Sequence, residues 1–144
     1  MELASRPAEV ALVCMPFSEL GQPSLALGLL HACCTQAGVS AQVFSGHLWF
    51  AEQNGVSLSN WVFESGSGTL LGEWLFSHAL FPDFEPDEEA YLAGARDQLK
   101  LSNQTWWRLL VERYPYLSFK VLVRELRRTT PAFIEMAANR VLSA

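Results

Sequence analysis

The feature that most constrains the fold is a strand–helix–strand pattern over residues 10–48. Residues 10–15 form a continuous apolar run that includes two β-branched valines and is followed by Pro16. Such a run is typical of a strand buried on both faces of a parallel sheet. Residues 41–45 alternate like a second strand, and a helical segment lies between the two. The spacing predicts a βαβ unit, whose crossover is expected to be right-handed.

The helix between these strands is expected over residues 24–37. It is almost wholly apolar, and Gly38 follows its last turn, as is common where a helix ends. The segment before it, residues 16–23, has prolines at both ends and Gly21 between them, which predicts a loop.

After residue 48 the pattern becomes helical. Residues 49–53 fit either a strand end or the start of a helix, residues 65–68 (Ser-Gly-Ser-Gly) predict a flexible linker, and residues 83–86 predict an acidic turn. Helices are expected over residues 70–81, from Asp87 with acids in its first turn, over 106–114, over 119–127, and from Thr130 and Pro131 to Leu142. The last of these takes Thr130 as its N-cap and Pro131 as its first helical residue.

These elements predict a single α/β domain. It has an N-terminal tail over residues 1–9, a partial Rossmann-like βαβ start over 10–48, and a mostly helical C-terminal part over 49–144 that packs on it as a cap. A length of 144 residues suits one domain, and a composition that is 50% hydrophobic excludes a disordered chain.

The charge and hydropathy patterns indicate whether the chain binds a membrane or nucleic acid. The longest apolar run, residues 25–30, is far shorter than the ~18–20 residues that cross a bilayer, so we expect no membrane contact and a cytoplasmic location. Residues 73–95 hold six acids and no Lys or Arg, whereas residues 96–144 hold nine bases. These bases lie among acids along helical stretches, which favours solvated helix faces over binding to nucleic acid.

The cysteines do not form a metal-binding motif. Cys14, Cys33 and Cys34 give no CxxC or CxxxCxxC spacing, and neighbouring residues on a helix point about 100° apart. We therefore expect buried, reduced cysteines of a cytosolic protein and no metal site.

The best candidate for a binding surface is the loop after the first strand. Ligands of open α/β sheets lie outside the carboxyl ends of the strands. Met15, Pro16, Phe17 and Ser18 occupy that edge, and His47, which follows the second strand, is placed to meet a ligand there. The alternative is an ordinary tight connection. The chain lacks GxGxxG, GxxxxGK[ST] and GxSxG, so no residue is assigned a catalytic role.

Aromatic side chains on the predicted helices suggest a second surface. Trp74, Trp106 and Trp107, together with neighbouring aromatic residues, would form a groove for a peptide or a protein. The alternative is that these side chains pack in the hydrophobic core.

Several segments taken together resemble a known family. In order they are VALVCMPF at residues 10–17, PSLALGLL at 23–30, GV at 38–39, LWFAE at 48–52, LLGEWLF at 70–76, ALF at 79–81, DEEAY at 87–91 and PAF at 131–133. The chain resembles the N-terminal region of the cobalamin-dependent radical S-adenosylmethionine (SAM) enzymes that mature ribosomally synthesised peptides (RiPPs). LLGEWLF is the most specific segment of this resemblance.

The resemblance implies a Rossmann-like cobalamin-binding domain that precedes a radical SAM barrel, with peptide C-methylation as the usual reaction. The family's CxxxCxxC motif is missing, so we expect no iron–sulfur cluster in this chain and no catalysis by it alone. Cobalamin would be held only with a partner chain or a C-terminal part beyond Ala144. Of the family's cobalamin contacts, only the loop residues 15–18 have a match here.

The sequence thus gives two main functional hypotheses; a third, a small free-standing enzyme, is disfavoured because no complete set of nucleophile, base and orienting residue is found. The first is a stand-alone or excised N-terminal domain, or an accessory subunit, that helps a radical SAM partner polypeptide hold cobalamin or the precursor peptide. The second is a non-catalytic peptide- or protein-binding module. A truncated sheet also has an open apolar edge, which would favour a homodimer.

Overall fold

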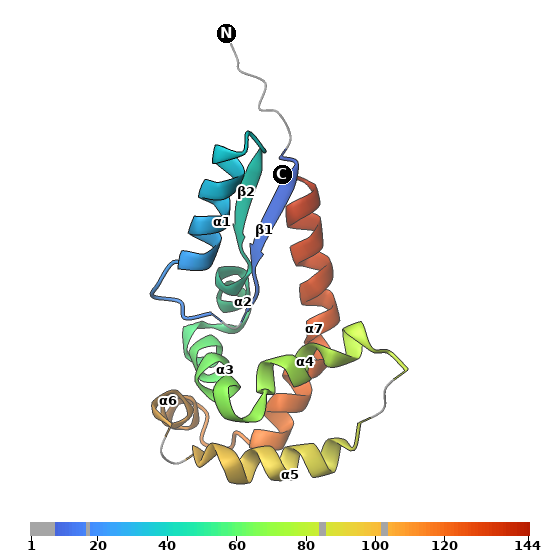
Figure 1. Cartoon of the computed structure of the whole chain (residues 1–144). Coiled ribbons are helices and arrows are strands. Elements are labelled where there is room, and N and C mark those ends of the chain that lie inside the picture. Colours follow the sequence, from blue (N-terminus) through green and yellow to red (C-terminus); the bar gives the residue numbers. More distant parts are fainter. Residues whose placement is uncertain (1–7, 17, 84–85, 102–103) are drawn as a thin grey trace.

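The structure is a computed structural model that describes residues 8–16, 18–83, 86–101 and 104–144. Figure 1 shows the strands and α1 at one end of the molecule, α5 and α6 at the other, and α7 running between the ends. The elements are β1 (Val10–Cys14), α1 (Leu25–Gln36), β2 (Ala41–Ser45), α2 (Gly46–Asn54), α3 (Val56–Thr69), α4 (Leu71–Leu80), α5 (Glu88–Leu99), α6 (Thr105–Arg113) and α7 (Phe119–Leu142).

The expected βαβ start is confirmed. β1 and β2 pair in parallel, with Val10 opposite Ala41 and Cys14 opposite Ser45. The connecting helix begins where the sequence predicts, because the Ser24 side chain accepts a hydrogen bond from the backbone N–H of Leu27 at 3.3 Å. Past its other end, Gly38 has a φ of 73°, a left-handed conformation that glycine adopts without strain.

The two faces of the sheet are covered by different helices. Successive side chains of a strand point to opposite faces. Cys14 and Val43 lie on the face that α1 covers, where they line a cavity with Leu27. Val13 and Met15 lie on the other face, beside the C-terminal half of α7. Figure 1 shows this half of α7 running next to β1.

The expectation that β1 is buried on both faces is wrong. Cys14 alone is buried among the five residues of β1, and Val43 of β2 is 42% exposed. None of the residues of α1 is buried either, and Leu25, Leu29 and Leu30 are exposed. The reason is the size of the sheet: within the described residues each strand pairs only with the other, so both outer edges are open.

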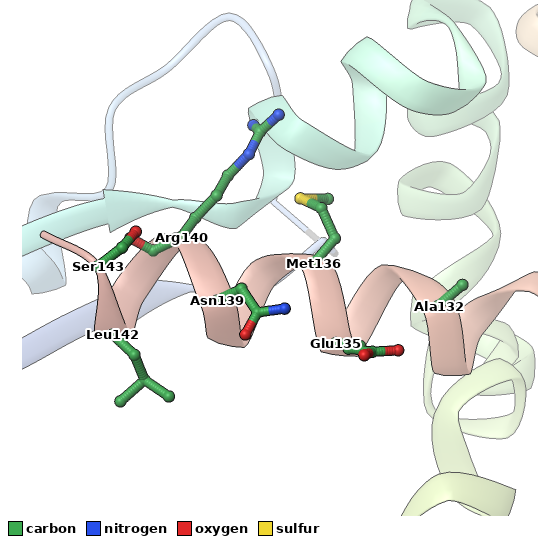
Figure 2. Close-up of a pocket in the computed structure, with 7 residues that line it drawn as sticks. All are labelled: Ala132, Glu135, Met136, Asn139, Arg140, Leu142 and Ser143. Atoms are coloured by element: carbon green, nitrogen blue, oxygen red, sulfur yellow. The ribbon is translucent and has the colours of Figure 1, made fainter.

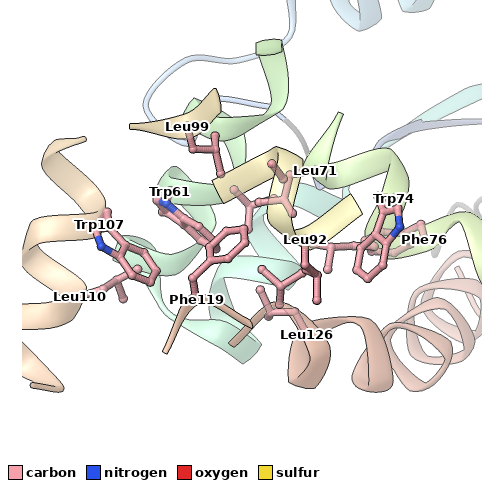
Figure 3. Packing of buried hydrophobic residues seen from close by; sticks show 14 of the residues in the cluster. Trp61, Leu71, Trp74, Phe76, Leu92, Leu99, Trp107, Leu110, Phe119 and Leu126 are labelled. Carbon is pink, nitrogen blue, oxygen red and sulfur yellow. The ribbon is translucent and has the colours of Figure 1, made fainter. Parts of the chain in front are cut away.

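The hydrophobic core lies in the helical part instead. Trp61, Leu71 and Leu75 have no exposed surface, and Trp61 packs against Trp107 with ring centroids 5.2 Å apart (Figure 3). Phe119 at the start of α7 packs edge-on against the ring of Trp61. Buried aromatic pairs contribute strongly to stability, because each ring removes a large apolar area from water. Among the described residues, this core cluster contains none from β1 or β2.

The predicted linker at residues 65–68 is wrong, because these residues lie inside α3. Glycine and serine are poor helix formers, at a cost of up to about 1 kcal/mol per glycine. The same helix buries Trp61 and Val62 completely, and Ser65 is 1% exposed. Burial of two large side chains outweighs the low helix propensity, and the helix continues to Thr69.

The predicted helix start at Thr130 is also wrong, since α7 continues through Pro131. Proline has no N–H to donate to the carbonyl oxygen four residues before it, here that of Arg127. The hydroxyl of Thr130 lies 2.8 Å from this oxygen and donates to it in place of the missing N–H. Thr130 is 1% exposed, so the replacement bond is protected from water.

The remaining helices agree with the sequence apart from details. The undecided residues 49–53 lie in α2, and Asp87 caps α5 by accepting from the N–H of Ala90 at 2.9 Å. α4 forms as expected, although its last residue Leu80 and the following Phe81 are exposed. The middle of the predicted acidic turn, residues 84–85, lies outside the described residues.

Acidic residues of α5 form ion pairs with basic residues of α7. Lys120 contacts Glu89 at 2.6 Å, and Arg124 contacts Glu88 at 2.7 Å, both between α7 and α5. Lys120 and Arg124 therefore lie along an exposed helix face opposite acids, as the charge pattern predicts.

Candidate functional site

A cavity of about 400 Å³ lies at the carboxyl ends of the two strands. Its walls come from the ends of β1 and β2, the loop before α1, the first two turns of α1 and the start of α2. The lining residues are Cys14, Leu20, Gly21, Gln22, Pro23, Ser24, Leu27, Gly28, His31, Val43, Ser45, His47 and Leu48. This is the edge at which open α/β sheets bind their ligands.

Gly46 positions one wall of this cavity. A Cβ atom on this residue would lie 2.6 Å from the backbone oxygen of Cys14, closer than atoms of these types approach. Glycine therefore lets α2 begin directly against the end of β1. The chain turns from β2 into α2 without an intervening loop, which brings His47 to the edge of the sheet.

His47 is the buried titratable residue of the cavity. Its side chain is 6% exposed, and its Nδ1 atom has no hydrogen-bond partner among the described residues. Burial lowers the pKa of His47 below its ordinary value of 6.5, because a charged imidazole is poorly solvated there. The ring is therefore neutral at neutral pH, with one ring nitrogen able to accept a hydrogen bond or bind a metal.

The loop after β1 is held by short contacts. The thiol of Cys14 lies 3.1 Å from the hydroxyl of Ser18 and donates to it, and the side chain of Pro16 is fully buried. The thiol is buried, so Cys14 acts here as a small packing residue with a weak donor.

The structure gathers only part of the predicted cofactor site. His47 lines the cavity, and Ser18 reaches its wall through Cys14. Met15 instead lies on the opposite face of the sheet, in an apolar depression against α7. Pro16 packs inside the protein, and Phe17 lies outside the described residues.

Sequence reasoning did not assign the wall that α1 contributes. Ser24, Leu27, Gly28 and His31 line the cavity together, and they are spaced as i, i+3, i+4 and i+7 along one helix face. This spacing is visible in the sequence. However, almost every residue of the helix is apolar, so hydrophobicity does not distinguish the face that points toward the cavity.

The predicted aromatic groove is not formed by Trp74 and Trp107, because both side chains lie in the core. Trp74 is 8% exposed, stacks on Tyr91 with centroids 4.5 Å apart, and lies under the guanidinium of Arg127 at 4.1 Å. Burial raises the pKa of Tyr91 to about 12, and its hydroxyl donates to the Thr69 carbonyl. Trp106 is half-buried against the same core.

A second depression, of about 700 Å³, lies along the C-terminal half of α7. Figure 2 shows that its lining side chains come from this one helix and from Ser143, which follows it; Met136, Asn139 and Arg140 are among them. Arg140 contacts Glu52 at 3.0 Å and lies over the ring of Trp49. A strip along one helix does not enclose a small molecule, so the cavity beside β1 and β2 is the stronger candidate.

Nowhere in residues 8–16, 18–83, 86–101 and 104–144 do three His, Cys, Asp or Glu side chains gather closely enough to hold a metal ion. Over the same ranges, none of the helices combines the length and apolar character that crossing a bilayer requires.

Known proteins give no match to this chain: comparison with protein-family models, with curated proteins and with solved structures finds none. The fold and the cavity are therefore the basis for assigning a function.

Proposed function

We propose that this chain is a non-catalytic, Rossmann-like accessory domain of a cobalamin-dependent radical SAM system that matures a ribosomally synthesised peptide. Its role is to help a partner polypeptide hold cobalamin. The observation that carries this proposal is the cavity at the carboxyl ends of two parallel strands, with the buried imidazole of His47 in its wall. The segments that resemble the family's N-terminal region support the same assignment.

The cavity fits part of cobalamin. An imidazole nitrogen is a common ligand of transition metals, and the apolar wall of Leu20, Leu27 and Val43 suits the organic part of a cofactor. A corrin ring with its nucleotide tail is larger than about 400 Å³, so only a portion of the cofactor enters. When bound, cobalamin supplies the cobalt centre that carries a methyl group. This chain supplies part of the pocket, and the remainder comes from a partner.

The surface around the sheet suits such a partner. Both edges of the β1–β2 sheet are open among the described residues. On α1, Leu25, Leu29 and Leu30 are 77%, 60% and 51% exposed, which is an unusual density of exposed leucines on one helix. A partner that adds strands to the sheet and a helix beside α1 would cover these groups.

Spectroscopic titration with hydroxocobalamin tests the proposal. We expect a saturable change in the corrin absorption bands when the chain is mixed with a partner that carries CxxxCxxC, and a weaker change with the chain alone. Leu29→Glu should reduce co-purification with that partner while the helical core keeps its melting temperature, because Leu29 is 60% exposed and lies outside the core cluster. Unchanged corrin bands with and without the partner would reject the cobalamin assignment.

The second candidate function, a peptide- or protein-binding module without cobalamin, is favoured by the same exposed leucines of α1. The two candidates differ in one result. If the chain is a binding module, it captures its partner through α1, and the corrin absorption bands of hydroxocobalamin stay unchanged when the chain is added.

A further inference from the structure

The last turn of α4 contacts α7 at the position of Pro131. In this turn, Nε2 of His78 lies 3.4 Å from the hydroxyl oxygen of Thr130. The same hydroxyl oxygen lies 2.8 Å from the Arg127 carbonyl oxygen and 3.2 Å from that of Leu75. Thr130 directly precedes Pro131, which has no N–H. The ring of His78 therefore contacts the hydroxyl that supports α7 at its proline.

These contacts indicate which ring nitrogen of His78 carries the hydrogen in the neutral form. The hydroxyl of Thr130 has a single hydrogen, and its shortest contact is with the Arg127 carbonyl oxygen, so it donates there. Its oxygen is then the acceptor for His78, and Nε2 is the donor. The other ring nitrogen, Nδ1, is buried and has no hydrogen-bond partner among the described residues. Nδ1 is therefore the nitrogen that a second proton would occupy.

The surroundings of the ring oppose this second proton. Protonation would create a buried N–H without an acceptor among the described residues, and a positive charge near the guanidinium of Arg127. Burial lowers the pKa of His78 below its ordinary value of 6.5, Arg127 lowers it further, and a hydrogen bond with the Leu75 backbone raises it. The C-terminal end of α4 also favours a positive charge, but the combined effect is a lowered pKa.

Carboxylates do not offset the charge of Arg127 at this ring. Among the described residues, Arg127 is the charged group that contributes to the pKa of His78, and none of the carboxylates of α3, α4, α5 and α7 does so. Glu88 of α5 acts on Arg127 instead, and Glu73 of α4 acts on Tyr91. The neutral ring is thus the form that this contact accommodates.

From these contacts we infer that His78 is a pH-sensitive switch between α4 and α7. The neutral ring donates to Thr130 and holds the last turn of α4 against α7. The protonated ring is better solvated in water, so acid releases this turn and lets α7 bend at Pro131. The part of α7 beyond Pro131 lies against Met15 of β1, and its position is what the switch controls. This inference goes beyond the proposed function and does not depend on it.

The pH dependence has a definite sign. The pKa of His78 in the folded chain is lower than the ordinary value of 6.5 that applies to the unfolded chain, so the unfolded chain binds the proton more tightly. The folded chain is therefore destabilised as the pH falls below about 6.5. Between pH 7.5 and 5.5, His78 should raise the equilibrium constant for unfolding by up to about tenfold. Burial also lowers the pKa of His47, which contributes in the same direction.

Urea unfolding of two variants separates the two histidines. Glutamine keeps an N–H close to the position of Nε2 and does not titrate. In a His47→Gln background, the rise of the unfolding constant from pH 7.5 to 5.5 should be at least about twofold smaller once His78→Gln is added. An equal rise with and without His78→Gln would overturn the inference.

Nuclear magnetic resonance of the wild-type chain tests the switch without a substitution. The ring signals of His78 should titrate with a midpoint below pH 6.5. The backbone amide signals of Thr130 and Ala132, on either side of Pro131, should shift with the same midpoint. The amide signal of Gly94 in α5 is the control and should not follow this midpoint. A His78 midpoint at or above pH 6.5, or amide signals of Thr130 and Ala132 that do not follow it, would overturn the inference.

Discussion

Gly46 joins the sheet to the helical part at a point where the backbone is crowded. Its backbone lies against the carbonyl of Cys14, and the next residue, His47, enters the cavity wall. A single small residue therefore sets both where α2 begins and where the buried imidazole lies. Its hydrogen side chain matters for space and not for a special φ, since Gly46 is not among the residues with positive φ.

Gly46→Ala should lower the free energy of unfolding by about 1–3 kcal/mol, because the added methyl group meets backbone that cannot move aside easily. Gly94→Ala is the control: no atom lies within 4 Å of an added Cβ there, and Gly94 lies in the interior of α5. That variant should gain about 0.5–1 kcal/mol. Urea unfolding followed by circular dichroism measures both, and equal effects of the two substitutions would show that the crowding at Gly46 is unimportant.

The sequence was sufficient to place His47 at the carboxyl edge, because a residue that follows a parallel strand must lie there. It was not sufficient to predict whether the side chain of Cys14 or that of Met15 points to the face with the cavity. Both are apolar, so the run of residues 10–15 does not show which of two successive side chains points to which face. The structure directs Cys14 to the cavity and Met15 to α7.

Helix α7 continues through a proline because a neighbouring side chain replaces the missing backbone donor. Thr130 donates to the Arg127 carbonyl, and its hydroxyl also lies 3.2 Å from the Leu75 carbonyl of α4. The residue that supports the helix at its break therefore also contacts the neighbouring helix of the core.

Thr130→Val keeps the side-chain shape and removes this donor. It should lower the free energy of unfolding by about 1–3 kcal/mol, the cost of a buried acceptor left without a partner. Thr130→Ser keeps the hydroxyl and should lose less. Pro131→Ala restores an N–H for Arg127, so Thr130→Val should cost clearly less in that background. Additive effects in this double-mutant cycle, measured by chemical denaturation, would contradict the explanation.

Elements with strong local signals were predictable. Ser24 and Asp87 cap their helices as expected, and Gly38 ends α1, because each of these residues acts on its immediate neighbours. Two of the wrong predictions, the linker at 65–68 and the helix start at Thr130, have the opposite cause. In each case a residue that disfavours helix locally is overruled by burial against distant segments, which a single sequence does not display.

The molecule as a whole combines a well-packed helical core with a thinly covered sheet. Buried residues of the core come from α2 to α7, whereas α1 contributes none. Local opening costs little where few apolar groups are buried, so stability should differ between the two parts. The homodimer expected from the open sheet edge stays a prediction, and light scattering across concentrations would test it.

Hydrogen–deuterium exchange measured by mass spectrometry should show this difference. We expect peptides from α1 to exchange faster than peptides from α4 and from the first half of α7. Addition of a ligand or partner that occupies the cavity and the α1 surface should slow exchange in α1 and leave α4 unchanged. Equal protection of α1 and α4 in the free chain would contradict this division of stability.

The residues that line the cavity and the residues that form the core cluster are separate sets within the described chain. This separation has an evolutionary consequence. We expect substitutions of the exposed lining residues to leave the helical core intact, so selection can act on binding specificity there without first compensating for lost stability. In a set of related sequences, the buried aromatic pattern of the helices should therefore persist while residues 20–31 diverge.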